Sequence, residues 1–275
     1  MNVKFSIIIP SLNSKIFLNQ CLQSIFEQTY QNYEIIIIDG GSKDGTVEFL
    51  KTFNRKIKWI SEKDNGQSDA INKGISLSTG NWITWQNCDD YYHDKNAFSF
   101  FADAIKKNKN KLLFVGNINL VNRENKILRD VKYFKPNFYS LLYEGMTLTN
   151  QASFWSKDLH IKIGNLRNFK INFDYDWFLR ILKNFPDCGF HLNKTIGCFR
   201  IHKDQKTQKQ NLIDFENLKK IKIDYGYNKN YAFFIKTYLM IRKFFCYLFQ
   251  GNIFYILRGF LKFFFIRKNK EYIES

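Results

Sequence analysis

The stretch NWITWQNCDDYY, residues 81–92, decides how the rest of the chain is interpreted. Residues 82–85 are aromatic or β-branched, which predicts a buried strand. The strand is followed by two adjacent carboxylates, Asp89 and Asp90. Carboxylates this close raise each other's pKa unless a cation lies between them, and a divalent cation with oxygen ligands suits that position. The alternative is a solvated turn in which one of the two acids caps a helix that begins near Asp94.

Three more apolar runs precede this strand and predict a sheet. They lie at residues 4–9, where Pro10 is expected to end the strand, at 34–38 and at 58–61. Helical spacing of apolar residues between the runs gives the order β-α-β-α-β-α-β. The run at 34–38 is apolar after its first residue, which is typical of a parallel strand covered on both faces. The crossover rule then predicts a doubly wound α/β fold with a mostly parallel sheet flanked by helices.

Polar loops follow the first two strands at the edge where ligands bind in open α/β sheets. Ser11 and Asn13 follow the first strand, and Asp39 begins the loop DGGSKDGT at 39–46. Neither the GxGxxG spacing of a dinucleotide site nor the GxxxxGK[ST] of a P-loop is present. A nucleotide at this edge would therefore be held by acids and a metal rather than by a glycine-rich nest.

The region after residue 96 predicts a helix at 97–107, strands at 112–115, 118–121 and 127–131, and a polar and aromatic segment at 147–155 that could line a pocket. A second helix follows at FDYDWFLR, with Asp174 at its start. A carboxylate there is stabilised by the helix dipole, so simple capping is the alternative to a catalytic role. Residues 197–202 predict a strand that ends in the basic pair Arg200 and His202.

The composition of the chain is strongly basic and free of cysteine motifs. Its 275 residues carry 42 Lys and Arg against 25 Asp and Glu, a net charge of +17, which favours a polyanionic partner. The five cysteines are widely spaced and form no CxxC pair, so we expect a reducing cytoplasm and neither a zinc site nor a disulfide framework. No apolar run reaches the length of a bilayer span, and none resembles a secretory signal.

The character of the sequence changes near residue 226, so we expect a main domain at 1–225 and an appendage at 226–275. From residue 229 onward the chain has nine Lys or Arg and two Glu among dense Phe, Tyr, Leu and Ile. This pattern predicts two amphipathic helices, hinged near Gly251, that lie on an anionic membrane surface. The alternatives are helices packed on the main domain or an oligomer contact. Binding of single-stranded nucleic acid is disfavoured because the apolar runs exceed what base stacking needs.

Five motifs together resemble those of inverting family 2 glycosyltransferases with the GT-A fold, of the type that builds bacterial cell-surface polysaccharides. They are SIIIPSLN at 6–13, EIIIIDGGSKDGT at 34–46, DNGQSDAINKGISLSTGNWITWQNCDD at 64–90, FDYDWFLR at 173–180 and FRIH at 199–202. The resemblance covers about the first 200 residues. It implies a sugar transferase with a nucleotide diphosphate donor, UDP by family frequency, and an acceptor hydroxyl on a glycan or a lipid-linked molecule. Such acceptors suit the basic aromatic tail, and together with the cysteine content they lead us to expect peripheral association with the cytoplasmic, inner face of the cell membrane.

The resemblance also implies roles for individual residues. The residues that correspond to the nucleotide-sugar site are Ser11, Asn13, Asp39, Asp64, Lys73, Asn87 and His202. Many members have a second acid after the one at Asp39, where this chain has Gly40. Asn87, Cys88 and Asp89 stand at the DxD-like motif, so metal binding is expected of Asp89 and Asp90. Asp174 corresponds to the catalytic base, with Asp176 as the nearby alternative.

General chemistry agrees with these assignments. Mg²⁺ or Mn²⁺ neutralises the charge that develops on a departing nucleotide diphosphate, and a carboxylate takes the proton of the attacking hydroxyl. A rival hypothesis is a catalytically silent membrane- or polymer-binding protein on the same fold. Such a protein would be expected to lose Asp89, Asp90 or Asp174, and all three are present.

Overall fold

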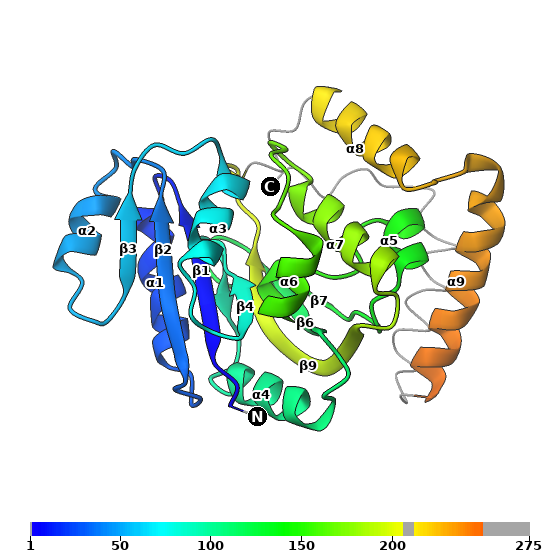
Figure 1. The fold of residues 1–275 in the computed structure, drawn as a ribbon, viewed down its shortest axis with the longest axis horizontal. Helices are drawn as coiled ribbons and strands as arrows, with labels where there is room; N and C mark the ends of the chain where they lie inside the picture. The colour runs from blue at the N-terminus through cyan, green and yellow to red at the C-terminus, as the bar shows by residue number, and fades with distance from the viewer. Residues whose placement is uncertain (1, 206–211, 250–275) are drawn as a thin grey trace. The chain divides into compact units, whose positions relative to one another are not determined.

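The structure is a computed structural model that describes residues 2–205 and 212–249. The chain divides into two compact units, Met1–Gly226 and Tyr227–Ser275. In the first unit, a central sheet has helices on both of its faces (Figure 1).

The N-terminal half of the first unit is built from alternating strands and helices (Figure 1). Strands β2, β1 and β4 pair in parallel, and β3 adds to β2 in parallel. The predicted order and direction are therefore confirmed. The elements are β1 (Phe5–Ser11), α1 (Lys15–Phe26), β2 (Tyr33–Asp39), α2 (Thr46–Thr52), β3 (Lys58–Ser61), α3 (Gln67–Ser76) and β4 (Trp82–Trp85).

Strand β1 continues through Pro10, and the prediction that Pro10 ends it is wrong. The carbonyl of Ile8 accepts a hydrogen bond from the Gln86 N–H at the end of β4, so Pro10, two residues on, has its nitrogen on the same side. β4 has already ended there, and the missing N–H of Pro10 costs the sheet no ladder hydrogen bond. The carbonyl of Pro10 accepts a 3.0 Å hydrogen bond from Sγ of Cys88 instead.

The second half of the unit extends the same sheet with antiparallel and parallel pairs. The full strand order is β3-β2-β1-β4-β8-β6-β9-β5, with β7 paired to β6. The remaining elements of this unit are β5 (Tyr91–Tyr92), α4 (Ala97–Lys107), β6 (Leu113–Val121), β7 (Ile127–Val131), α5 (Phe138–Glu144), the short 3-10 helix η1 (Asn150–Ala152), β8 (Ser153–Ser156), α6 (Lys157–Ile163), α7 (Phe173–Asn184), β9 (Gly189–Arg200) and α8 (Leu212–Asp224).

One strand, β6, replaces the two strands that were expected at 112–115 and 118–121. Its pairing with β9 continues across the small and polar residues Gly116 and Asn117, with shifts of register on either side of Asn117. A Cβ atom at Gly116 would lie 2.2 Å from Cγ1 of Ile196, so only glycine lets the two strands stay this close. The polar interruption in the sequence therefore marks an irregularity within a strand rather than a break between two strands.

The two faces of the sheet have separate apolar layers. Phe5 and Trp82 lie on one face in a cluster that includes residues of α1 and α4. On the other face, Trp85 packs edge-on against Trp155 and against Trp177 of α7, with ring centroids 5.1 and 5.9 Å apart. Helix α3 covers the same face as α7. The aromatic layer beneath α7 fixes the start of that helix at the edge where β1 and β4 end.

The described part of the second unit is one helix, α9 (Lys229–Phe249). Its apolar side chains are largely exposed; Phe233, Phe234 and Tyr238, for example, are 73%, 69% and 65% exposed. Gly251 and the second expected helix lie outside the described residues. Within residues 2–205 and 212–249, no helix combines the length and the apolar character needed to cross a membrane.

Candidate functional site

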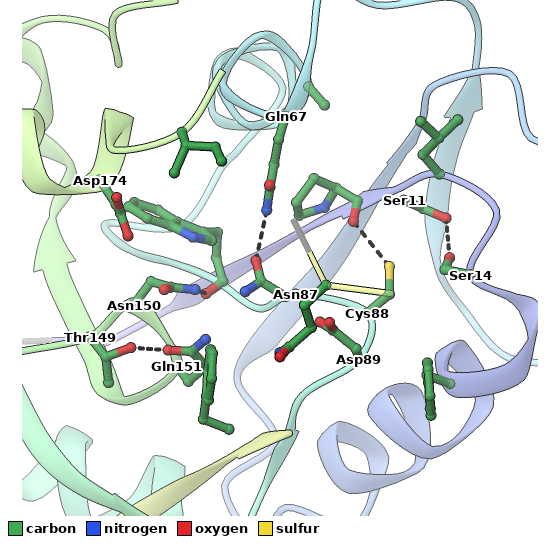
Figure 2. A pocket seen from close by; sticks show the side chains of 18 of the residues that line it. Ser11, Ser14, Gln67, Asn87, Cys88, Asp89, Thr149, Asn150, Gln151 and Asp174 are labelled. Carbon is green, nitrogen blue, oxygen red and sulfur yellow. Dashed lines mark hydrogen bonds between the residues drawn. The ribbon is translucent and has the colours of Figure 1, made fainter. Parts of the chain in front are cut away.

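A pocket of about 690 Å³ lies where β1 and β4 end and α7 begins. Seven of the predicted site residues line it, although they come from segments far apart in the sequence. They are Ser11, Asn13, Asp64, Asn87, Asp89, Asp174 and His202. Figure 2 labels Ser11, Asn87, Asp89 and Asp174 among them. In the view of Figure 2, Asn87 and Asn150 lie between Asp89 and Asp174. The other four predicted residues, Asp39, Lys73, Asp90 and Asp176, are described by the structure but do not line this pocket.

Asp89 and His202 form the polar pair at one side of the pocket. Oδ2 of Asp89 lies 3.0 Å from Nε2 of His202, and the ring of Phe17 packs 4.9 Å from the imidazole. Nδ1 of His202 is buried with no hydrogen-bond partner in the described structure. A carboxylate is a ligand that suits Mg²⁺ and Mn²⁺, and a neutral imidazole is a common metal ligand through either ring nitrogen; here Nε2 is the nitrogen beside Asp89.

The donor set fits a divalent metal that is shared with a substrate. Among the described residues, no group of three or more His, Cys, Asp and Glu side chains is placed to hold a metal ion. Mg²⁺ in nucleotide sites is commonly bound by one or two protein ligands together with phosphate oxygens and water. Asp89 and His202 match that pattern better than they match an all-protein metal site.

Asp90 lies beside Asp89, but its carboxylate is turned into the protein. Its Oδ1 accepts a 2.8 Å hydrogen bond from the N–H of Arg200, and its Oδ2 accepts bonds of 2.6 Å from Gln151 and 3.1 Å from Asn87. The residue is 1% exposed, and burial together with the charge of Asp89 raises the pKa of its carboxyl well above the usual value. The Asp90 carboxylate therefore connects the segments of Arg200, Gln151 and Asn87, whereas Asp89 lines the pocket.

Asn87 connects Asp90 to the start of α3. Its Nδ2 donates to Asp90, and its Oδ1 accepts a 2.9 Å hydrogen bond from Nε2 of Gln67. Gln67 is the first residue of α3 and also lines the pocket. Gln67 was not predicted as a site residue, although it lies between the predicted residues Asp64 and Lys73, in the motif DNGQSD.

Asp39 organises the loop after β2. Its Oδ2 accepts hydrogen bonds from the N–H groups of Gly41 and Ser42 and from the hydroxyl of Ser61, at 3.1, 2.9 and 2.7 Å. Its Oδ1 accepts a 3.3 Å bond from the hydroxyl of Ser11 and a bond from that of Ser42. The side chain is fully buried, so in this structure it shapes the pocket through Ser11 rather than facing it.

Gly40 makes room for Asp64. A Cβ atom at position 40 would lie 2.8 Å from Oδ2 of Asp64, and an acid there would also meet a like charge. Asp64 lines the pocket and accepts a 2.9 Å hydrogen bond from the N–H of Gly66. The departure from the family pattern at Gly40 therefore goes together with the close approach of a pocket carboxylate from another loop.

Asp174 stands in the first turn of α7 and faces the pocket (Figure 2). Burial raises the pKa of its carboxyl, against an opposing hydrogen bond from the N–H of Tyr175 at 2.8 Å. A raised pKa makes a carboxylate a stronger base, which suits removal of a proton from a hydroxyl group. The alternative was that Asp174 simply caps the helix. The N-cap residue of α7 is Asn172, and Asp174 lies within the first turn.

Asp176, two residues on, lies in a different environment. It is fully buried, and its carboxylate pairs with Arg167 at 3.1 Å and with Arg180 at 3.2 Å. The hydroxyl of Tyr225 donates a further 2.9 Å hydrogen bond to Oδ1. These contacts make Asp176 a structural anchor of α7 that does not face the pocket.

Lys73 lies on α3 but outside the pocket. Its ammonium group is 2.9 Å from Glu62 and 3.5 Å from Asp69.

The polar residues of η1 reach the pocket. Asn150 and Gln151 line it, as was predicted for the polar and aromatic segment at 147–155. Arg123 and Lys170 also line the pocket and were missed, because each lies in a loop without a motif.

Comparison with known proteins gives one consistent family. The sequence model described as "Glycosyl transferase family 2" matches residues 6–183, more than half of the chain. A "PGL/p-HBAD biosynthesis glycosyltransferase" of Mycobacterium bovis (strain BCG / Pasteur 1173P2) is 30% identical over 188 residues, which are 66% of this chain and 70% of that protein. "Glycosyltransferase GlyA" of Streptococcus pneumoniae is 27% identical over 216 residues, which are 73% of this chain and 31% of that protein.

Solved structures share the fold at low sequence identity. S. aureus TarS 1–349 in complex with UDP-GlcNAc superposes with a TM-score of 0.67 at 16% identity, over 84% of this chain and 70% of that chain. The mannosyltransferase PcManGT from Pyrobaculum calidifontis, in complex with GDP-Man and Mn²⁺, gives a TM-score of 0.55 at 13% identity, over 86% of this chain and 73% of that chain. The predicted GT-A type of α/β fold is confirmed.

Proposed function

The chain belongs to glycosyl transferase family 2, and from that premise we propose that it moves a sugar from a nucleotide diphosphate donor to an acceptor hydroxyl with inversion at the anomeric carbon. One observation carries the proposal: Asp89 and Asp174, one suited to hold a metal and one suited to act as a base, line the same pocket. The TarS structure is a complex with UDP-GlcNAc, and the PcManGT structure is a complex with GDP-Man and Mn²⁺. Both support a nucleotide sugar as the ligand of this fold.

Two residues would hold the metal in this proposal. Asp89 supplies a carboxylate and His202 an imidazole nitrogen, while Asp90 supports the loop from behind. Mg²⁺ or Mn²⁺ bound there would neutralise the charge of the departing diphosphate. Ser11, Asn13 and Asp64 line the same pocket and are proposed to contact the nucleotide.

Asp174 is the proposed base. The acceptor oxygen forms a bond to the anomeric carbon as the bond from that carbon to the diphosphate oxygen breaks. The hydroxyl proton passes to the Asp174 carboxylate, and the nucleoside diphosphate leaves with the bonding electrons. Attack from the face opposite the leaving group inverts the carbon. Asn87 and Asn150 also line the pocket and are proposed to hydrogen-bond the sugar.

UDP is the proposed donor nucleotide, and a glycan or lipid-linked molecule is the proposed acceptor. Helix α9 supports an acceptor at a membrane, because its exposed Phe and Tyr side chains alternate with Lys236, Arg242 and Lys243. We therefore propose peripheral association with the anionic inner face of the cell membrane.

Thermal unfolding of the full chain with a panel of nucleotide diphosphate sugars, in Mn²⁺, Mg²⁺ or EDTA, tests the donor proposal. One nucleotide class should raise the Tm in the presence of metal only, because a ligand at 100 times its Kd stabilises the native state by about 2.7 kcal/mol. A chain that no donor stabilises, with or without metal, would contradict the proposal.

A further inference from the structure

Arg200 is a fully buried cation directly behind the Asp89 loop, with 1% of its surface exposed. It belongs to the strand-end motif FRIH, of which the proposed function uses only His202. Burial of a guanidinium is costly unless its donors are bonded. The partners of these donors therefore indicate what the residue does.

The guanidinium bonds to three separate segments. Its Nε donates to the carbonyl of Asp89 at 2.8 Å, one Nη to the carbonyl of Arg123 and to Oδ1 of Asn125 at 2.8 and 2.7 Å, and the other Nη to Oε1 of Gln20 at 2.7 Å. A longer contact of 3.5 Å reaches the carbonyl of Asn122. Each of these acceptors is a carbonyl oxygen of the main chain or of a carboxamide.

Aromatic rings hold the guanidinium on its other sides. Its carbon lies 4.9 Å from the centre of the Phe17 ring and 5.3 Å from that of Tyr91. Phe17 also contacts the imidazole of His202. The planar group is therefore fixed in position by stacking as well as by hydrogen bonds.

Arg200 also bonds to the metal loop through its main chain. Its N–H donates to Oδ1 of Asp90, while its side chain donates to the carbonyl of Asp89. These two bonds hold consecutive residues of the loop, and His202 follows only two residues after Arg200. Both proposed metal ligands are thus oriented by one residue, and the turn that carries the pocket residue Arg123 is tied to the same group.

We propose that Arg200 is the positioning residue of the metal site: its buried guanidinium fixes Asp89 and His202 in the geometry that binds the metal with the donor diphosphate, and couples them to the 122–125 turn. This inference rests on the proposed function. Lysine could keep the charge at this position but not the fork of donors, so the geometry and not the charge alone is required.

Binding of Mn²⁺ to the full chain, measured by electron paramagnetic resonance with saturating UDP, tests the proposal without relying on turnover. Arg200→Lys should weaken Mn²⁺ binding by about 10- to 100-fold, the effect typical of groups that orient metal ligands. The matched control is Arg180→Lys. Arg180 is also a mostly buried arginine that donates to main-chain carbonyls, at Ile163 and Asn165, but it lies outside the pocket. Its substitution should lower the Tm and leave Mn²⁺ affinity within about twofold.

A milder variant keeps the test decisive if Arg200→Lys fails to fold. Asn125→Gly removes one acceptor of the guanidinium and tolerates the φ of +68° at this position. It should weaken Mn²⁺ binding severalfold and lower the Tm less than Arg200→Lys does, because the same Nη keeps its bond to the carbonyl of Arg123. Wild-type Mn²⁺ affinity in a folded Arg200→Lys variant, or in Asn125→Gly when Arg200→Lys does not fold, would overturn the positioning role. Absence of Mn²⁺ binding by the wild-type chain would instead overturn the metal site itself, and the inference with it.

Discussion

Oδ2 of Asp89 lies 3.0 Å from Nε2 of His202, although 113 residues separate them in the sequence. The pairing of strands brings them together. β5 follows the Asp89 loop at once and pairs antiparallel with β9, with Tyr91 opposite Cys198, and His202 lies just past the end of β9. The side of the pocket proposed to hold the diphosphate is therefore built by the sheet itself.

Asp174→Asn is expected to lower sugar transfer by about 10²- to 10⁴-fold and to leave metal-dependent nucleotide binding unchanged. In the wild-type chain, burial raises the pKa of the Asp174 carboxyl. The basic form is lost as the pH falls through that raised pKa, so the acid limb of kcat/KM should lie above the pH of about 4 expected of an ordinary aspartate. Measuring kcat/KM for the donor as a function of pH locates this acid limb.

Asp176→Asn is the matched control for this assignment. It weakens the ion pairs of the buried Asp176 carboxylate with the mostly buried Arg180 and the exposed Arg167, so the free energy of unfolding should fall by about 3 kcal/mol. The fraction that remains folded should still transfer sugar. Loss of transfer in a stable Asp176→Asn variant, with activity retained in Asp174→Asn, would move the base to Asp176.

Glu34→Gln is expected to destabilise the fold in a pH-dependent way. Burial alone would raise the pKa of Glu34, but hydrogen bonds from Lys58, Ser6 and Thr79 together lower it to about 2. A carboxylate with a lowered pKa stabilises the fold above the unfolded value of about 4.5, and this contribution is lost as the pH falls through 2. Because solvent screens part of the effect, the loss at pH 7 should be about 1–2 kcal/mol.

Denaturant unfolding of wild type and Glu34→Gln between pH 7 and pH 2 measures this difference. Glu124→Gln, in the exposed turn between β6 and β7, is the control and should change stability little at any pH. A Glu34→Gln difference that stays constant across this range would show that the charge of Glu34 contributes nothing.

Replacing Phe233, Phe234 and Phe245 of α9 together with serine should reduce binding to anionic vesicles by at least about tenfold. Each ring can contribute about 1.5–3 kcal/mol when it leaves water. Co-sedimentation with phosphatidylglycerol vesicles gives the measurement. Ile161→Ser on α6, where the side chain is 68% exposed, is a control that should bind as wild type does. Equal co-sedimentation of the triple variant would count against a membrane role for α9.

The sequence predicted the bounds of elements best where the apolar pattern was uninterrupted. The helix at 97–107 and the strands at 58–61 and 127–131 have the predicted bounds. The end of β1 was mispredicted at Pro10 because the sequence does not show that the neighbouring strand β4 has already ended on the side of the Pro10 nitrogen. Gly116 and Asn117 misled because a local irregularity can be accommodated within a continuous strand.

The roles of adjacent acids could not be separated from the sequence. Asp89 and Asp90 are chemically equal neighbours, yet one lines the pocket and the other is bonded by groups of Gln151 and Arg200, 61 and 110 residues away. The same holds for Asp174 and Asp176, which are separated by the helical rotation between them and by the arginines that face only the second. The contacts of Asp90 are long-range, and no local motif encodes them, whereas Asp176 is distinguished in part by Arg180, four residues further along the same motif.

Calorimetric titration of the donor nucleotide diphosphate into wild type and Asp89→Asn, with Mn²⁺ and then with EDTA, tests most directly whether Asp89 holds the donor through a metal. We predict that Asp89→Asn weakens binding in Mn²⁺ by at least about tenfold, and that EDTA lowers the affinity of wild type to the same level. Asp187→Asn, at a carboxylate whose side chain is 88% exposed, should bind as wild type does. Equal affinity of wild type and Asp89→Asn in Mn²⁺ would contradict the account.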